Sequence, residues 1–246
     1  MDSKFIILNS APRAYSEGKA NFYGYDFLVN QHTLIPRPET EQLVERTLGL
    51  AHLHLPGGGA IRILDVGTGS GVIAITLKKL LPNAVVEATD ISPQALLVAR
   101  QNARANLTEV IFHQGNLLES AKGRFDLIIT NLPYVPAGRW RFLDRKVRDF
   151  EPRSAIIAGR DGLKWIRQFC QQIGVYTKQN MLGKSLTSDY LNAPSIVALE
   201  IDDTHGPRVL QLLQDALPNH LVKIESDLAH KVRFAFALPR GRELRI

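Results

Sequence analysis

Short apolar runs alternate with amphipathic segments along most of the chain, which predicts a regular succession of strands and helices. Buried strands are expected at residues 61–66, 85–91, 110–114, 125–130 and 195–201. Helices are expected between them, at residues 72–81, 93–106, 162–176 and 207–216. Strands that alternate with helices in this way favour a mostly parallel sheet that is covered on both faces.

Both ends of the chain add further elements to this pattern. Residues 22–29 alternate aromatic and polar positions around Gly24, which is typical of a hairpin. The PRPETE segment then opens a helix with an acidic first turn. Its apolar positions recur at helical spacing, at Leu43, Val44, Leu48 and Leu50. Near the C-terminus, residues 221–226 and 232–238 predict two strands that pair antiparallel.

These elements together predict an α/β fold with one mostly parallel, seven-stranded sheet and an antiparallel C-terminal hairpin. We expect residues 1–45 to form a short N-terminal extension that contains the hairpin and PRPETE. Residues 46–246 are expected to form the main domain. Within it, the PGGG segment at 56–59 breaks the chain before the first clear strand. Residues 178–194 are expected to form a surface loop before the fifth strand.

Composition narrows the functional classes. Among 246 residues, 45% are hydrophobic and 22% are charged, as in ordinary soluble domains, and no apolar run approaches the length of a membrane span. The single cysteine, Cys170, excludes a disulfide framework, and the seven histidines lack the spacing of metal ligands. We therefore expect a cytoplasmic protein without a metal. The net charge of +6 favours an acidic partner, such as RNA or an RNA-bound protein.

The stretch ILDVGTGSGV carries the first candidate site, at the junction of the first parallel strand and its helix. Gly67, Gly69 and Gly71 let the backbone turn tightly and approach a ligand beside a helix N-terminus. Asp90 ends the next strand, where a carboxylate can bind ribose hydroxyls. The dinucleotide fingerprint fails because its sixth position is Val72. Asp65, immediately upstream, suits a cationic ligand better than a pyrophosphate.

A second candidate site follows the apolar run FDLIIT, where the chain continues as Asn131-Leu132-Pro133-Tyr134. The Asn131 amide offers both a donor and an acceptor, and the Leu132 carbonyl offers a second acceptor. Pro133 biases Leu132 toward an extended conformation, and Tyr134 provides a flat face. This corner suits a planar –NH2 group. A plain turn that closes a strand is the alternative, and the glycine loop and Asp90 upstream make it the weaker one.

These motifs resemble known methyltransferases. DxGxGxG resembles the first motif of the class I S-adenosylmethionine-dependent enzymes, and the Asn131 corner resembles those that methylate –NH2 nitrogens. The segments FYGYDFLVNQHTLIPRPETEQLVE and VRDFEPRSAIIAGRDGL resemble the peptide chain release factor glutamine methyltransferases (the PrmC/HemK family). The resemblance runs from Phe22 to the C-terminus. It implies a Rossmann-like class I fold, S-adenosylmethionine as cofactor, and methylation of the Gly-Gly-Gln glutamine of a release factor.

The resemblance also assigns residues by position. Asn131, Pro133 and Tyr134 would be catalytic, by holding a poorly nucleophilic amide nitrogen in line with the methyl group, and no histidine or cysteine is expected to take part. The substrate would contact Asn131, Leu132, Pro133, Tyr134, Arg37 and Glu39. The cofactor would contact Asp65, Gly67, Thr68, Gly69, Ser70, Gly71, Asp90, Asn116, Leu117 and Asn131. At Asn116 the family often has aspartate, so the adenine amine would meet an uncharged acceptor.

Two other readings remain open. Leucine at position 132 also occurs in ribosomal RNA adenine dimethyltransferases, so an RNA or DNA adenine amino-group methyltransferase is the nearest alternative. The basic stretch GRWRFLDRKVRDFEPR suits proximity to RNA or the ribosome, although it equally suits a solvated loop with Arg–Asp pairs. A non-catalytic module that retains the cofactor fold is the other reading.

The family's helical N-terminal domain has no counterpart in Met1 to Asn21, so we expect another surface to contribute to release-factor recognition.

Overall fold

A single mixed sheet forms the centre of the protein, in a computed structural model that describes residues 11–55, 60–182 and 196–240. The strand order is β5-β4-β3-β6-β7-β9-β8, in which β9 alone runs in the direction opposite to the other six strands. The strands are β3 (Arg62–Val66), β4 (Val85–Asp90), β5 (Ile111–Gln114), β6 (Leu127–Thr130), β7 (Ile196–Glu200), β8 (His220–Ser226) and β9 (Val232–Pro239). This arrangement confirms the predicted seven-stranded α/β fold and its C-terminal hairpin.

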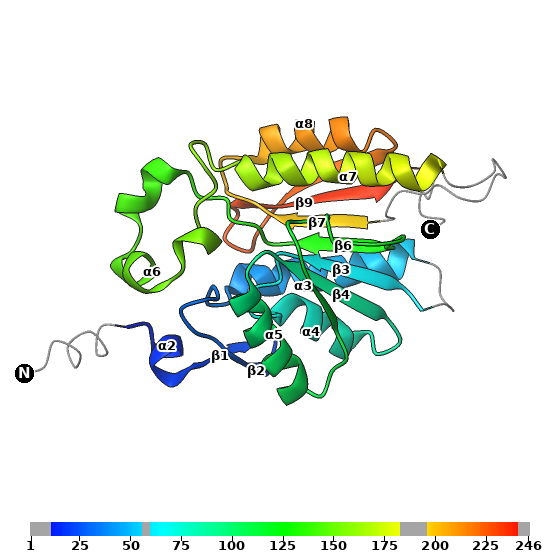
Figure 1. Cartoon of the computed structure of the whole chain (residues 1–246). Helices are drawn as coiled ribbons and strands as arrows, with labels where there is room; N and C mark the ends of the chain where they lie inside the picture. Colours follow the sequence, from blue (N-terminus) through cyan, green and yellow to red (C-terminus); the bar gives the residue numbers. More distant parts are fainter. Residues whose placement is uncertain (1–10, 56–59, 183–195, 241–246) are drawn as a thin grey trace, which may run out of the picture.

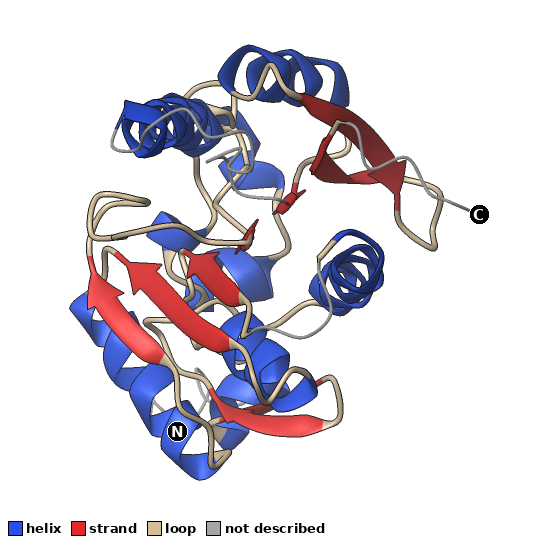
Figure 2. Cartoon of the chain, turned by 90° about the vertical axis from the view of Figure 1, so that its right-hand side faces the viewer, coloured by secondary structure: helices blue, strands red, loops and turns tan. Residues whose placement is uncertain are grey.

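Helices cover both faces of the sheet (Figures 1 and 2). One face carries α3 (Pro38–His54), α4 (Val72–Leu80) and α5 (Pro93–Ala105), and the other carries α7 (Lys164–Leu182) and α8 (Gly206–Ala216). Each face has its own cluster of buried apolar side chains. The central strands β3 and β6 contribute to both clusters, which is why apolar residues follow one another in them instead of alternating with polar ones, as in Ile63 and Leu64 of β3 and Leu127 to Ile129 of β6.

Local sequence signals set the ends of the helices. Ser92 caps α5, where its hydroxyl accepts a hydrogen bond from the Ala95 N–H at 3.2 Å and Pro93 occupies the first helical turn. The preceding helix, α4, ends at Leu80, two residues before Pro82, because proline cannot continue a helix. These boundaries place the carboxyl ends of β3 and β4 beside the beginnings of α4 and α5.

The N-terminal hairpin forms a separate two-stranded sheet, β1 (Lys19–Phe22) and β2 (Tyr25–Leu28), after the short helix α2 (Arg13–Glu17). Its turn lies at Tyr23 and Gly24, and the first strand begins upstream of the predicted range, at Lys19. The hairpin docks on α5 through Asn102, which accepts from the Leu28 N–H and donates to the Leu28 carbonyl. This reciprocal pair satisfies both backbone groups at the end of β2.

The connection from β6 to α7 is a compact excursion from the body of the protein, visible around the α6 label in Figure 1. It contains η1 (Ala137–Phe142), α6 (Arg145–Phe150) and η2 (Arg153–Ala155). Helix α7 extends beyond the predicted end, to Leu182. The remainder of the expected 178–194 surface loop lies outside the described residues.

Two kinds of feature are absent from the part of the chain that the structure describes. None of the helices in this part has the length and apolar character needed to cross a membrane. Nor do the described residues contain a group of three or more histidine, cysteine, aspartate or glutamate side chains arranged to hold a metal ion.

Candidate active site

The glycine loop joins β3 to α4 in a tight path. Gly67, Gly69 and Gly71 have φ angles of 73°, 58° and 85°, in the left-handed region that favours glycine. The N–H groups of Gly67 and Thr68 donate to the Thr89 carbonyl at 2.8 and 2.9 Å. The loop is therefore held against the end of β4, with the backbone of Gly67 and Gly69 open to a ligand.

Asp65 holds this loop through hydrogen bonds to the loop and to the first turn of α4. It is fully buried, and its Oδ2 accepts from the Thr68 hydroxyl at 2.6 Å and the Ala74 N–H at 3.2 Å. Its Oδ1 has no hydrogen-bond partner among the described residues. Burial raises the pKa of the Asp65 carboxyl to about 7, against the hydrogen bonds that lower it. Asp65 thus links the loop to the first turn of α4.

Asp90 ends β4 with both carboxylate oxygens engaged by backbone donors. Oδ2 accepts from the Gly69 N–H and Oδ1 from the Ser92 N–H, both at 2.8 Å. Burial is the largest influence on the pKa of this carboxyl and raises it. Each oxygen keeps a second lone pair, so Asp90 can also accept from a ligand hydroxyl.

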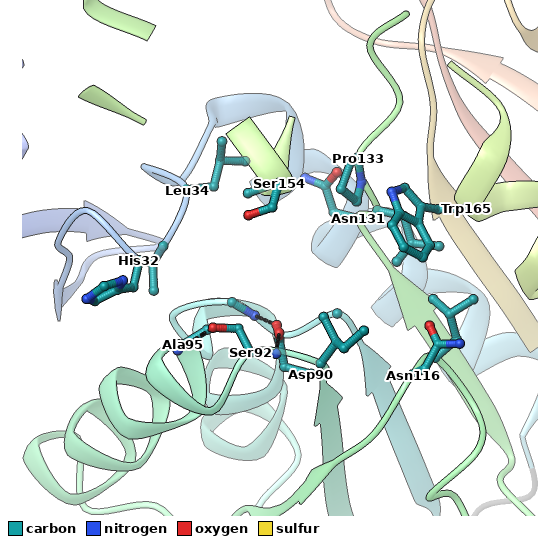
Figure 3. Close-up of a pocket in the computed structure, with 17 residues that line it drawn as sticks. His32, Leu34, Asp90, Ser92, Ala95, Asn116, Asn131, Pro133, Ser154 and Trp165 are labelled. Carbon is teal, nitrogen blue, oxygen red and sulfur yellow. Dashed lines mark hydrogen bonds between the residues drawn. The ribbon is translucent and has the colours of Figure 1, made fainter. Parts of the chain in front are cut away.

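A cavity of about 150 Å³ opens above these residues (Figure 3). The structure brings eight of the predicted site residues to its wall: Gly67, Gly69, Asp90, Asn116, Leu117, Asn131, Leu132 and Pro133. Other predicted residues lie outside that wall, in the loop's support or on α3: Asp65, Thr68, Ser70, Gly71 and Glu39. The cavity therefore joins the glycine loop, the end of β4 and the Asn131 corner.

A second cavity, of about 190 Å³, lies on the other side of the Asn131 corner. Arg37, Tyr134, Val135 and Val147 line it, and it shares Leu34, Asn131, Leu132, Pro133 and Ala155 with the first cavity. The corner is therefore the wall between two spaces. A group held in one space can therefore meet a group held in the other beside this corner.

Hydrogen bonds to Thr40 and Glu200 hold Asn131 and Tyr134 of the corner in place. Asn131 Nδ2 donates to the Thr40 hydroxyl at 3.0 Å, and that hydroxyl donates to Glu200 Oε2 at 2.7 Å. The Tyr134 hydroxyl donates to Glu200 Oε1 at 3.0 Å. Burial, followed by the negative charge of Glu200, raises the pKa of the Tyr134 hydroxyl well above its usual range. Tyr134 therefore presents its ring, not its hydroxyl, to the second cavity.

Arg37 and Asn116 have partners of their own. The Arg37 guanidinium pairs with the buried carboxylate of Glu151, which also accepts from the Ile35 N–H. This pair ties the PRPETE segment to the end of α6 beside the second cavity. Asn116 Nδ2 donates to Glu119 Oε1 at 2.9 Å, and the Asn116 main-chain carbonyl accepts from the Glu119 N–H, which leaves the side-chain Oδ1 of Asn116 as the acceptor available to a ligand.

Sequence reasoning missed part of the wall. His32, Thr33 and Leu34 reach the first cavity from the segment after the hairpin, and Ser154, Ala155 and Trp165 reach it from the excursion and α7. No histidine was expected to take part in the chemistry, and His32 lines the first cavity beside Ala95, away from Asn131 (Figure 3). Five of these residues lie in the two segments whose sequences resemble the family, the one that contains PRPETE and the one that contains FEPRSA, so the resemblance could have pointed to them. Nothing in the local sequence marked Trp165.

Comparison with known proteins decides the family. Residues 47–143 match the model of the methyltransferase small domain. The chain is 40% identical to the release factor glutamine methyltransferase of Enterococcus faecalis, over 94% of this chain and 77% of that protein. It is 37% identical to the Bacillus cereus protein of the same name, over 92% of this chain and 76% of that one. The chain belongs to the release factor glutamine methyltransferase family.

Solved structures agree with this family at the level of fold. The catalytic domain of human Mettl16, in complex with the MAT2A 3′UTR hairpin 6, superposes with a TM-score of 0.60, covering 96% of this methyltransferase and 92% of that domain. The two sequences are only 15% identical, so the similarity concerns the fold alone.

Proposed function

We propose that this methyltransferase transfers a methyl group from S-adenosylmethionine to the side-chain amide nitrogen of the glutamine in a Gly-Gly-Gln motif of peptide chain release factors. The observation that carries the proposal is the position of Asn131. Its amide lies in the wall shared by the two cavities, and its Oδ1 has no hydrogen-bond partner among the described residues. The family to which the chain belongs supports the same substrate.

The first cavity fits S-adenosylmethionine. Asp90 would accept hydrogen bonds from the ribose hydroxyls, and Ile91 and Leu117 offer apolar surface for the adenine. The side-chain Oδ1 of Asn116 would accept from the adenine amine, and the side-chain-free backbone of Gly67 and Gly69 leaves room for the amino-acid end. The bound cofactor supplies an electrophilic methyl group on a sulfonium. Asp65, Thr68, Ser70 and Gly71 would contribute indirectly, by holding the loop in shape.

The second cavity would hold the glutamine side chain. Asn131 Oδ1 and the Leu132 carbonyl would accept its two amide hydrogens, which orients the nitrogen and limits the positive charge that builds on it. Pro133 and the Tyr134 ring would flank the planar amide. Arg37 and Glu39 would shape the approach from α3. Orientation would supply much of the rate enhancement, since well-placed reactants gain about 7–11 kcal/mol relative to free ones.

We further place the protein in the cytoplasm, near RNA or the ribosome. Cys170 is a free, buried thiol whose pKa is raised by burial to about 12, so it is unreactive. The excursion after the corner is rich in arginine, and part of that charge is paired, as in Arg145 with Asp149 and Arg139 with Asp202. Its net positive charge would favour an acidic partner beside the second cavity.

A radiolabelled methyl-transfer assay tests the proposal. The purified protein is incubated with S-adenosylmethionine and either a release factor or ribosomal RNA. Label is expected on the release factor and is expected to disappear when the Gly-Gly-Gln glutamine is replaced. Label on RNA alone would instead support the adenine methyltransferase alternative. Absence of S-adenosylmethionine binding by calorimetry would support a non-catalytic module.

A further inference from the structure

The hydrogen bonds behind Asn131 form an unbroken relay through three parts of the chain. Asn131 follows β6, Thr40 lies in the first turn of α3, and Glu200 ends β7. The relay runs from Asn131 Nδ2 to the Thr40 hydroxyl and from that hydroxyl to Glu200 Oε2. Thr40 and Glu200 are 3% and 1% exposed, so water does not compete for these bonds. These hydrogen bonds therefore determine which atom of the Asn131 amide, the oxygen or the nitrogen, faces Thr40.

We propose that Thr40 and Glu200 are positioning residues that fix the Asn131 amide with its oxygen, rather than its nitrogen, toward the substrate. The inference rests on the proposed function, because it concerns an –NH2 group as the substrate. It explains why a glutamate stands in the apolar core behind the corner. A charge buried at this depth is unfavourable unless it is hydrogen-bonded, and here both of its oxygens accept.

Counting hydrogens gives the direction of the relay. A carboxylate can only accept hydrogen bonds, so the single hydrogen of the Thr40 hydroxyl must point to Glu200. Thr40 can then only accept from Asn131, and the amide atom that faces it must be the –NH2. Asn131 Oδ1 is left to face away from Thr40. Substrate hydrogens thus meet an acceptor, as the proposed chemistry requires.

Protonation of Glu200 would reverse the direction of these hydrogen bonds. A protonated Glu200 can donate to Thr40, whose hydrogen is then free to turn toward Asn131. Asn131 would be most stable with its oxygen facing Thr40, and its –NH2 would face the substrate and repel the hydrogens of the amide. The relay thus works only while Glu200 is ionised.

The groups around Glu200 act on its charge in opposite senses. Thr40 and Tyr134 donate to it, Arg233 of β9 attracts its charge, and Glu39 of α3 repels it. Burial outweighs these partners and raises the pKa of the Glu200 carboxyl above its usual value of 4.5. The rate of methyl transfer is therefore expected to fall on the acid side at a higher pH than an exposed glutamate would dictate.

Kinetic variants separate this role from a structural one. Glu200→Gln keeps the shape but cannot ionise, and it reverses the relay when the new amide oxygen accepts from the Tyr134 hydroxyl and the new –NH2 donates to Thr40. We expect kcat to fall about 10- to 100-fold without loss of thermal stability, with cofactor affinity unchanged and the acid limb of kcat absent. Thr40→Val should lower kcat similarly, and Thr40→Ser, which keeps the hydroxyl, should restore it.

Thr47→Val is the matched control. Thr47 lies on the same helix, is fully buried, and its hydroxyl has no hydrogen-bond partner among the described residues. The substitution removes a buried hydroxyl without touching the relay, so kcat should not change. A Glu200→Gln enzyme that folds and keeps kcat within about twofold of the parent, with its acid limb, would overturn the proposal.

An NMR measurement reads the relay without turnover. In the ¹⁵N-labelled protein, one hydrogen of the Asn131 side-chain –NH2 is donated to a buried hydroxyl, so that hydrogen should exchange with water at least about tenfold more slowly than in Thr40→Val. Equal exchange rates would reject the relay whatever the substrate. If the parent enzyme labels RNA rather than the release factor, the proposed function fails, and the same variants are scored on RNA, where the relay predicts the same loss.

Discussion

Asn131 is the residue on which the proposed chemistry depends most directly. Replacing it with alanine removes the acceptor for a substrate hydrogen but leaves Asp90 and the glycine loop in place. We expect Asn131→Ala to abolish methyl transfer while S-adenosylmethionine binds within about tenfold of its original affinity, a change of at most about 1.4 kcal/mol. Transfer assays and calorimetry check the two halves. A variant that retained most of its activity would exclude Asn131 as the acceptor.

Asp65 makes a second prediction, about stability and pH. Its pKa of about 7 in the folded protein exceeds the ordinary value of 3.8, so the folded state holds the extra proton between these values. The resulting stabilisation is complete below about pH 4 and is lost as pH rises through 7, and it is on the order of 4 kcal/mol for a shift of this size. Asp65→Asn, which cannot ionise, should lack this loss.

Urea unfolding of the parent and of Asp65→Asn at several pH values measures the effect. The difference in unfolding free energy should move in favour of the variant between pH 5 and pH 8, because the other buried carboxyls, Asp90 and Glu200, remain in both proteins. Parallel pH profiles would show that Asp65 does not titrate in this window.

At the scale of elements, the loop-to-helix junction at Gly71 is tightly constrained. Gly71 caps α4 with φ 85°, and a Cβ added there would lie 2.9 Å from Ile75 Cδ1 and 3.2 Å from Ala99 Cβ. Gly71→Ala combines a left-handed backbone with crowding against α5. We expect it to lower the free energy of unfolding by about 1–3 kcal/mol in urea titrations.

Gly49→Ala provides the control for that substitution. Gly49 lies inside α3 with ordinary helical φ, and an added Cβ would meet no atom within 4 Å. Alanine there should stabilise the protein by about 0.5–1 kcal/mol, because glycine loses more backbone entropy in a helix. Two substitutions of the same chemistry should therefore have opposite signs, and equal effects would contradict the packing at Gly71.

The elements also show what sequence alone could predict. The parallel strands and their helices were predictable because apolar periodicity and Pro–Ser caps are local signals. The excursion after the corner was not, since its short turns have no such period. Thr40 and Glu200 were also missed, because they are 160 residues apart and meet only in the folded sheet. An acid at the carboxyl end of a buried strand was the available signal for Glu200.

For the molecule as a whole, the site lies where the sheet reverses its strand order. Successive strands proceed from β3 toward β5 on one side and toward β7 on the other, so β3 and β6 are the neighbours at the switch. In such sheets the crevice forms beyond the carboxyl ends of these strands, and here the glycine loop follows β3 and the Asn131 corner follows β6. The topology alone therefore brings the two motifs together.

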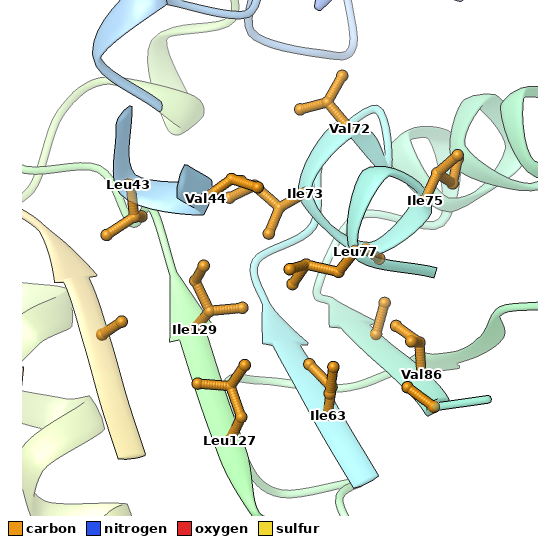
Figure 4. Packing of buried hydrophobic residues seen from close by; sticks show 14 of the residues in the cluster. Leu43, Val44, Ile63, Val72, Ile73, Ile75, Leu77, Val86, Leu127 and Ile129 are labelled. Carbon is orange, nitrogen blue, oxygen red and sulfur yellow. The ribbon is translucent and has the colours of Figure 1, made fainter. Parts of the chain in front are cut away.

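The N-terminal hairpin shares a core with this sheet. Phe22 and Phe27 are buried in the same cluster as Leu43 and Val44 of α3, which in turn lie beside Ile73 and Ile129 (Figure 4). The segment that follows the hairpin supplies part of the cavity wall. Folding of the hairpin, the sheet and the site is therefore expected to be a single event.

Phe27→Ala tests that coupling. Loss of a fully buried phenylalanine should lower the free energy of unfolding by about 3–5 kcal/mol for the whole protein, including the sheet. Near-ultraviolet circular dichroism and loss of S-adenosylmethionine binding should report the same transition midpoint. Leu28→Ala, one residue along the same strand but on its exposed side, should change the stability by less than about 1 kcal/mol. If the Phe27 variant lost its hairpin while the sheet kept its original midpoint, the hairpin and the sheet would be independent units.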